Sequence, residues 1–153
     1  MSRISPYNHE GYYDPTAFLA LNSVAEEQRR KQKEVRISAY TDKPYRPLVF
    51  ICSPYAGDIQ KNTDAARKYS KFAVDSGTIP FAPHLLFPQF LNDHDEYERE
   101  LGMLMGLAIL TKCAEVWVFG VQLSPGMRRE VKKAKQKEIP VRYFDTECRE
   151  VQV

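Results

Sequence analysis

The sequence predicts an α/β fold: a small Rossmann-like three-layer sandwich with a parallel sheet, preceded by an N-terminal helical arm. Two observations predict the sandwich. From residue 47 onward, short apolar runs alternate with amphipathic stretches, which is typical of βαβ units with right-handed crossovers. The first run, Leu48–Cys52, is apolar without a break, as in a strand that is buried on both faces of a parallel sheet.

The remaining elements continue this alternation. They are a helix over 58–77, a strand over 78–81, a helix over 93–112, a strand over 116–119, a helix opening at Ser124 and a strand over 140–144. Asp93 and Glu96 have the spacing of a capping box at the start of the second of these helices. Four strands predict the order 2-1-3-4, so the first and third strands are neighbours. Ligands bind at such a switch point, outside the carboxyl ends of the strands.

Residues 1–46 are predicted to form the arm, and residues 47–153 the α/β domain. Asp14 and Pro15 are typical of a helix start, and a helix is expected from there to Val35. Its apolar face gives way to a charged stretch. Two interpretations are open: a helix exposed on the surface, or an arm that packs on another subunit or partner.

Composition limits the function classes. The chain has 153 residues, 43% of them hydrophobic, and a net charge of +2, so a phosphate-backbone binder is not expected. The three cysteines, Cys52, Cys113 and Cys148, are scattered, which favours a reducing compartment without a disulfide framework. No apolar run suits a membrane span and no signal peptide is evident. We expect a cytoplasmic protein with no membrane or nucleic-acid partner.

The turn after the first strand supplies the first group of candidate residues, Ser53, Pro54, Tyr55, Gly57 and Asp58. Ser53 offers a hydroxyl and Tyr55 a ring face, while Gly57 permits close approach of the backbone to a ligand. Asp58 is suited to capping the next helix. The alternative is an ordinary turn between a strand and a helix.

The segment after the third strand supplies the second group. Its candidate binding residues are Phe119, Gly120, Ser124, Gly126, Met127 and Arg129. Ser124 is a good N-cap, and free amides at a helix N-terminus hold anions. Glu130 lies one to two turns inside this helix, where its carboxylate can serve as nucleophile or base. The alternative for Glu130 is a solvated residue that pairs with Lys133 or Lys137.

His84 follows the second strand among apolar residues. It is a candidate ligand contact, or else a hydrogen-bonded structural group. The three histidines are scattered, and the chain contains no HExxH, GxGxxG or GxxxxGK[ST] motif. We therefore expect neither a metal nor a cofactor.

Five segments in this order resemble the nucleoside 2-deoxyribosyltransferase-like superfamily, and more closely a branch of it found in phages and Gram-positive bacteria. The resemblance covers about residues 47–145. The segments are Phe50-Ile-Cys-Ser-Pro-Tyr55, Ala82-Pro-His84, Glu115-Val-Trp-Val-Phe-Gly120, Ser124-Pro-Gly-Met-Arg-Arg-Glu130 and Ile139-Pro-Val-Arg-Tyr-Phe144.

The resemblance implies a nucleoside or nucleotide-like ligand and a homo-oligomer, a dimer or higher. It implies that Glu130 attacks the sugar C1′ carbon, that a base leaves, and that a second base or water replaces it. It also implies that Ser53, Pro54 and Tyr55 lie beside the substrate. A carboxylate suits this chemistry because the transition state resembles an oxocarbenium ion.

One departure from the family matters. The active transferases carry an aspartate on the helix before the third strand, whereas residues 102–110 contain no carboxylate. Beside Glu130, Arg129 is expected to recognise a phosphate and Arg128 to be solvated. Three hypotheses remain open: an enzyme that cleaves or exchanges an N-glycosidic bond, a non-catalytic sensor or sponge for a nucleotide-derived ligand, and an interaction protein that keeps only the fold.

Oligomerisation has a separate indication in the helix over 93–112. A helix that is apolar on most of its circumference is buried on more than one side, so a second subunit or the N-terminal helix is expected to cover it. Its apolar residues are Leu101, Met103, Leu104, Met105, Leu107, Ile109 and Leu110.

Overall fold

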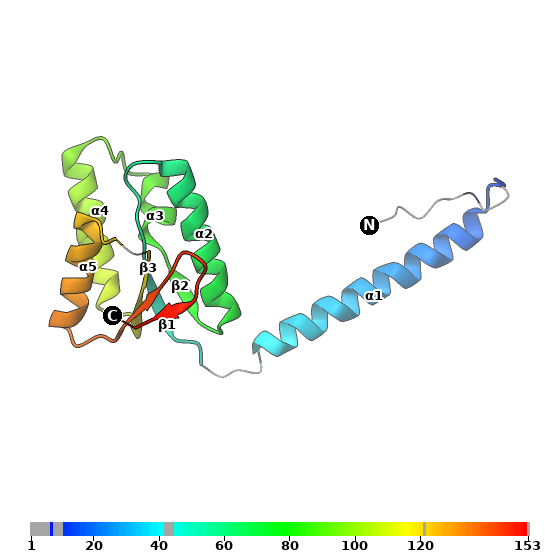
Figure 1. Cartoon of the computed structure of the whole chain (residues 1–153). Helices are drawn as coiled ribbons and strands as arrows, with labels where there is room; N and C mark the ends of the chain where they lie inside the picture. The colour runs from blue at the N-terminus through cyan, green and yellow to red at the C-terminus, as the bar shows by residue number, and fades with distance from the viewer. Residues whose placement is uncertain (1–6, 8–10, 42–44, 121, 153) are drawn as a thin grey trace. The chain divides into compact units, whose positions relative to one another are not determined.

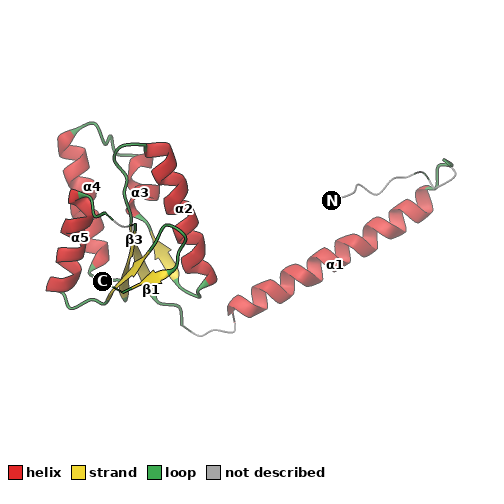
Figure 2. Ribbon diagram, in the orientation of Figure 1, coloured by secondary structure: helices red, strands yellow, loops and turns green. Residues whose placement is uncertain are grey.

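The computed structural model describes residues 7, 11–41, 45–120 and 122–152. The chain divides into two compact units, Met1–Tyr45 and Arg46–Val153, and each is described by itself. Figure 2 shows that the first contains one long helix and that the second contains every strand of the sheet.

The first unit is built on helix α1, Pro15–Thr41, a single continuous helix in Figure 1. It starts where Asp14 and Pro15 predicted but runs past the expected end, because residues 36–41 contain neither glycine nor proline. Exposed pairs one turn apart support it, such as Lys31 Nζ with Glu27 Oε1 at 2.9 Å. Each such pair adds only about 0.3–0.5 kcal/mol.

The second unit contains a five-stranded sheet in the order β2-β1-β3-β4-β5. Its strands are β1 (Leu48–Cys52), β2 (Ile79–Phe81), β3 (Glu115–Phe119), β4 (Val141–Phe144) and β5 (Glu150–Val151). The four predicted strands are parallel and in the predicted order, which confirms the fold class. The sequence analysis missed β5, which pairs antiparallel with β4 and makes the sheet mixed.

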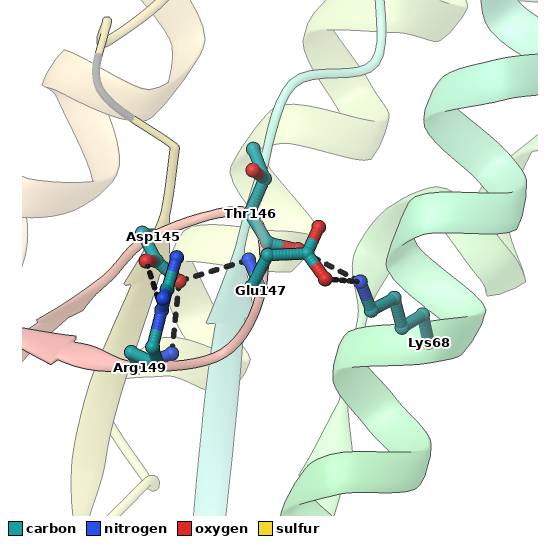
Figure 3. A network of polar contacts seen from close by, with 5 residues as sticks. All are labelled: Lys68, Asp145, Thr146, Glu147 and Arg149. Carbon is teal, nitrogen blue, oxygen red and sulfur yellow. Dashed lines mark hydrogen bonds and ion pairs between the residues drawn. The ribbon is translucent and has the colours of Figure 1, made fainter.

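The turn before β5 explains why this short strand forms (Figure 3). Asp145 Oδ1 accepts hydrogen bonds from the amides of Glu147 at 2.8 Å and Arg149 at 2.9 Å. Lys68 Nζ, on the neighbouring helix, donates to the carbonyl of Thr146 and to Glu147 Oε2, both at 3.0 Å. The turn is therefore fixed from both sides, and the chain returns along β4.

Helices cover both faces of the sheet, as Figures 1 and 2 show. They are α2 (Ile59–Asp75), α3 (Pro83–Leu86), the 3₁₀ helix η1 (Phe87–Gln89), α4 (Glu96–Leu110) and α5 (Pro125–Gln136). Residues of β1 and β3 alternate between two cores. Phe50 and Val118 pack with α4 and α5, whereas Ile51 and Trp117 pack with α2. The helices that follow β1 and β3 thus lie on opposite faces, as the predicted switch point requires.

The predicted start of α4 was wrong by two residues. Asp95, not Asp93, is the N-cap, and its Oδ1 accepts from the amide of Glu98 at 2.9 Å. Glu98 reaches back to the amide of Asn92 at 2.6 Å. Asp93 is left half-buried in the preceding loop. Among the helices described, none is long and apolar enough to cross a membrane.

Candidate functional site

A cavity of about 390 Å³ lies at the carboxyl ends of β1 and β3. Residues from four stretches of the chain, 53–56, 83–91, 93–106 and 124–130, line it. The first stretch follows β1 and the last contains the start of α5, so the cavity lies at the predicted switch point.

Glu130 lines this cavity, and helix α5 explains its burial. Ser124 caps the helix, its hydroxyl accepting from the amide of Met127 at 3.3 Å. Met127, Glu130, Val131 and Ala134 recur at helical spacing and form the buried face. Glu130 is only 3% exposed. The alternative that Glu130 is a solvated residue is therefore wrong.

The environment of Glu130 is unusual for a carboxylate. Its Oε2 is buried without a hydrogen-bond partner among the described residues. Burial raises the pKa of this carboxyl to about 7, and a hydrogen bond with the Cys52 thiol offsets a part of this shift. A carboxyl with a raised pKa in a cavity is typical of functional sites.

Ser53, Tyr55 and His84 form the wall on the β1 side. The Ser53 hydroxyl is buried and, like Glu130 Oε2, has no partner in the described part of the chain. The Ser53 carbonyl accepts a hydrogen bond from His84 Nε2 at 2.8 Å. The His84 ring stacks on Tyr55, with centroids 5.0 Å apart and planes 13° from parallel. His84 is thus both hydrogen-bonded and part of the cavity wall.

Burial lowers the pKa of His84, although the hydrogen bond to Ser53 and the charge of Asp93 act in the opposite sense. The imidazole is therefore mostly neutral at pH 7. Burial and the nearby Asp93 also raise the pKa of Tyr55, so its hydroxyl keeps its proton there.

Three residues predicted for the first turn do not line the cavity: Pro54, Gly57 and Asp58. Asp58 caps α2 instead, accepting the amide of Lys61 at 3.1 Å. Gly57 has a φ of +97°, which a residue with a Cβ adopts only at a cost. Asp58 and Gly57 thus have roles in the geometry of the turn.

Phe119 and Gly120 also lie outside the cavity lining. Side chains alternate along a strand, and this sends Phe119 to the α2 side. There it is fully buried, and its ring stacks on those of Tyr69 and Phe144, with centroids 4.1 Å and 5.0 Å away. Gly120 ends β3 with a φ of +102°, and its amide donates to the Phe144 carbonyl at 3.0 Å.

The α4 side of the cavity was missed by the sequence analysis. Gly102, Met103 and Gly106 line it, so no carboxylate lies on this stretch of the wall. A Cβ on Gly126 would lie 3.2 Å from Met103 Cε, so α5 and α4 pack closely at this point. The sequence offered one signal that α4 packs closely on its neighbours: Gly102 and Gly106 are four residues apart and so lie on the same face of the helix. The apolar lining from the preceding segment consists of Pro83, Phe87, Pro88 and Leu91.

Arg129 lies at the cavity, as predicted, but its guanidinium is engaged. Its Nη1 donates to Glu100 Oε2 at 2.9 Å and its Nη2 to Glu100 Oε1 at 2.5 Å. Both side chains are about half-exposed. A phosphate that binds Arg129 must displace Glu100. Arg128 is exposed and lines a separate, more open groove with Lys132 and Lys135.

The described residues contain no group of three or more histidine, cysteine, aspartate or glutamate side chains that could hold a metal ion. The charged residues that line the cavity are Asp93, Glu98, Arg99, Glu100, Arg129 and Glu130. Four of these, Asp93, Glu98, Arg99 and Glu100, were not candidates in the sequence analysis. They lie in a loop and at the start of α4, and tertiary packing rather than any local pattern sets the distance of these segments from the sheet.

The fold and the cavity together define an open α/β protein with a ligand-sized cavity at the switch point of its sheet. The chain belongs to the family described as Domain of unknown function (DUF7768), whose model matches residues 47–144. The comparison with curated proteins found no match.

Among solved structures, the chain is similar to a 2-deoxyribosyltransferase from the psychrotolerant bacterium Bacillus psychrosaccharolyticus. The TM-score is 0.54 at 14% identity, and the match covers 64% of this chain and 72% of that chain. A likeness at this identity shows the fold. The expected relationship to the nucleoside 2-deoxyribosyltransferases is thus confirmed at the level of the fold.

Proposed function

We propose that this domain binds a nucleoside-like ligand in the cavity and cleaves or exchanges its N-glycosidic bond, with Glu130 as the nucleophile. One observation carries the proposal: Glu130 Oε2 and the Ser53 hydroxyl are both buried without partners among the described residues and both line one cavity. A buried polar atom without a partner costs about 1–3 kcal/mol. A ligand hydroxyl that bonds to these atoms would recover that free energy.

The cavity suits such a ligand in size and in polarity. Its volume of about 390 Å³ lies within the usual range of about 300–1,000 Å³ for small-molecule sites. Ser53 and Glu130 supply polar groups that suit a sugar. Phe87, Leu91 and Met103 supply apolar surface that suits a flat base.

The proposed reaction has two displacements. An oxygen of Glu130 bonds to the sugar C1′ carbon as the bond from C1′ to the base nitrogen breaks, and the electron pair leaves with the base. A second base or water then bonds to C1′, the bond from C1′ to Glu130 breaks and returns its electron pair to the carboxylate, and the proton that the incoming group loses ends on the departed base. The negative charge of Glu130 stabilises the oxocarbenium-like transition state of both steps.

Base release tests the proposal. A panel of ribo- and deoxyribonucleosides and their monophosphates is incubated with wild type and with Glu130→Gln, and free base is measured by chromatography. We expect release by wild type and a loss of at least about 1,000-fold in Glu130→Gln, because glutamine keeps the shape but not the nucleophile. Glu138→Gln is the matched control, since Glu138 is exposed beyond the far end of α5. Equal rates in wild type and Glu130→Gln, or no release by either, refute the proposal.

A second candidate is a binding protein that leaves its ligand unchanged. It is favoured by the α4 wall, where Gly102, Met103 and Gly106 offer no acid to the departing base. Mass spectrometry of small molecules released from the purified protein separates the two. A ligand recovered intact after incubation supports the binding protein, and a free base supports the enzyme.

A further inference from the structure

We infer that His84 is the proton-transfer residue of this site, and that its Nδ1 atom exchanges the proton with the leaving base and with the attacking water. This inference rests on the proposed function. It assigns to the β1 side of the cavity the acid that is absent from residues 102–106 of α4.

The geometry fixes which ring nitrogen is available. His84 Nε2 lies 2.8 Å from the carbonyl oxygen of Ser53. A carbonyl only accepts hydrogen bonds, so the proton is on Nε2 and it is donated there. In the neutral ring Nδ1 is then an acceptor, and none of the described residues is hydrogen-bonded to it. The stacking on Tyr55 holds the plane of the ring.

Three other charged groups that line the cavity already have hydrogen-bond partners. Glu98 accepts the amide of Asn92 at 2.6 Å. Glu100 and Arg129 hold each other through two hydrogen bonds. The charge of Asp93 acts on His84 and favours its imidazolium form. Burial lowers the pKa of His84, and the charge of Asp93 offsets a part of this shift, in the way that carboxylates beside histidines do.

The two displacements then balance. In the first, imidazolium His84 gives its Nδ1 proton to the base nitrogen as the bond from C1′ to that nitrogen breaks and its electron pair stays on the base. In the second, neutral His84 takes a proton from the water whose oxygen bonds to C1′, while the bond from C1′ to Glu130 breaks and returns its electron pair to the carboxylate. His84 ends each cycle as it began.

His84→Gln tests the inference, because the glutamine amide can keep a donor near the Ser53 carbonyl but cannot titrate. We expect kcat on a nucleoside to fall by about 100-fold or more, as for loss of a general acid, with KM changed less than about threefold. A sugar whose leaving group departs as a stable anion, such as 4-nitrophenolate, needs no proton. With that substrate the first displacement, seen as the burst of nitrophenolate, should keep its wild-type rate.

The pH profile gives a second readout. The wild-type rate on nucleosides should fall on the alkaline side as His84 loses its proton, and His84→Gln should lose that limb. The titratable and charged groups that face the ring or line the same cavity are Tyr55, Asp93, Glu98, Arg99, Glu100, Arg129 and Glu130. Glu130 must be ionised to attack, so it accounts for the acid limb. Because burial lowers the pKa of His84 and raises that of Glu130 to about 7, the form with His84 protonated and Glu130 ionised is a minor one at every pH, and the rate is greatest between the two pKa values.

Three results overturn the inference. They are an equal slowing of both substrates by His84→Gln, wild-type activity in that variant, and ¹⁵N NMR spectra that place the proton of neutral His84 on Nδ1. Each of them leaves the role of Glu130 intact. The absence of base release by wild type from every substrate refutes the proposed function, and the role of His84 with it.

Discussion

The hydroxyl of Ser53 and Oε2 of Glu130 come from different segments of the chain and lie on the same cavity, each buried and neither hydrogen-bonded to any described residue. Buried polar atoms are nearly always paired in folded proteins. Two such unpaired atoms on a single cavity are unusual, and the contribution of each can be tested by a separate substitution.

Ser53→Ala should weaken ligand binding without destabilising the protein. The hydroxyl makes no hydrogen bond to the described residues that could be lost, so we expect an unfolding free energy unchanged or raised by up to about 1 kcal/mol. A ligand that bonds to the hydroxyl should bind about 2- to 10-fold more weakly. Thermal melts and calorimetric titration with a nucleoside measure the two effects.

Ser70→Ala is the matched control, because the Ser70 hydroxyl is also buried without a partner but Ser70 lies on α2, away from the cavity lining. It should leave ligand affinity at the wild-type value. Weaker binding in both variants would contradict a direct contact with Ser53.

Glu130→Gln should stabilise the protein at pH 8 but not at pH 4. Burial raises the pKa of Glu130 from 4.5 to about 7, so the folded chain holds a proton that the unfolded chain has lost. The stability that depends on this proton is complete below pH 4.5 and disappears as the pH rises through 7. The difference is on the order of 3 kcal/mol. Urea denaturation of both proteins across this range measures it, and parallel pH curves would contradict the burial of a lone carboxyl.

Glu100→Gln should increase the preference for a phosphorylated ligand. The carboxylate of Glu100 accepts hydrogen bonds from both Nη atoms of Arg129, whereas glutamine has one acceptor oxygen and no charge, so at least one of these N–H groups becomes free for a phosphate. A charged hydrogen bond contributes about 1.5–3 kcal/mol, so affinity for a nucleoside monophosphate should rise about 10-fold or more. Affinity for the nucleoside should not change. Titration calorimetry decides, with Glu96→Gln on the same helix as the control.

The protein should form a dimer or a higher oligomer through α4. Tyr97 and Leu104 on this helix are 77% and 56% exposed, and Leu101 lies between them. Multi-angle light scattering at micromolar concentration should give at least twice the monomer mass of 17.7 kDa, and Leu104→Glu should reduce it. A monomer in wild type would contradict the prediction.

The sequence was sufficient for the parts of the fold that depend on local pattern. Continuous apolar runs predicted β1 and β3, and helical spacing placed Glu130 on α5. The sequence was not sufficient for elements whose formation depends on tertiary contacts. Strand β5 has two residues, which is too short for any periodicity, and its pairing depends on the Asp145 turn.

The candidate site was predicted less completely than the fold. Ser53, Tyr55, His84 and Glu130 do line one cavity. Phe119 does not line this cavity. The alternation of side chains along a strand indicates this, because Phe119 lies two positions after Trp117 and shares its face of the sheet and not that of Val118. The α4 side of the cavity could not be predicted, since no local pattern tells how far a helix lies from a sheet.

The contact between Met103 and Gly126 has a consequence for ligand choice. The thioether of Met103 lies against a position with no side chain, and methionine is unbranched with three rotatable bonds. Rotation of this one side chain changes the width of the cavity without moving either helix. If the ligand is a nucleoside, as proposed, single-ring and double-ring bases should both fit against Met103. Met103→Leu, which has a stiffer side chain, should reduce the range of bases that bind.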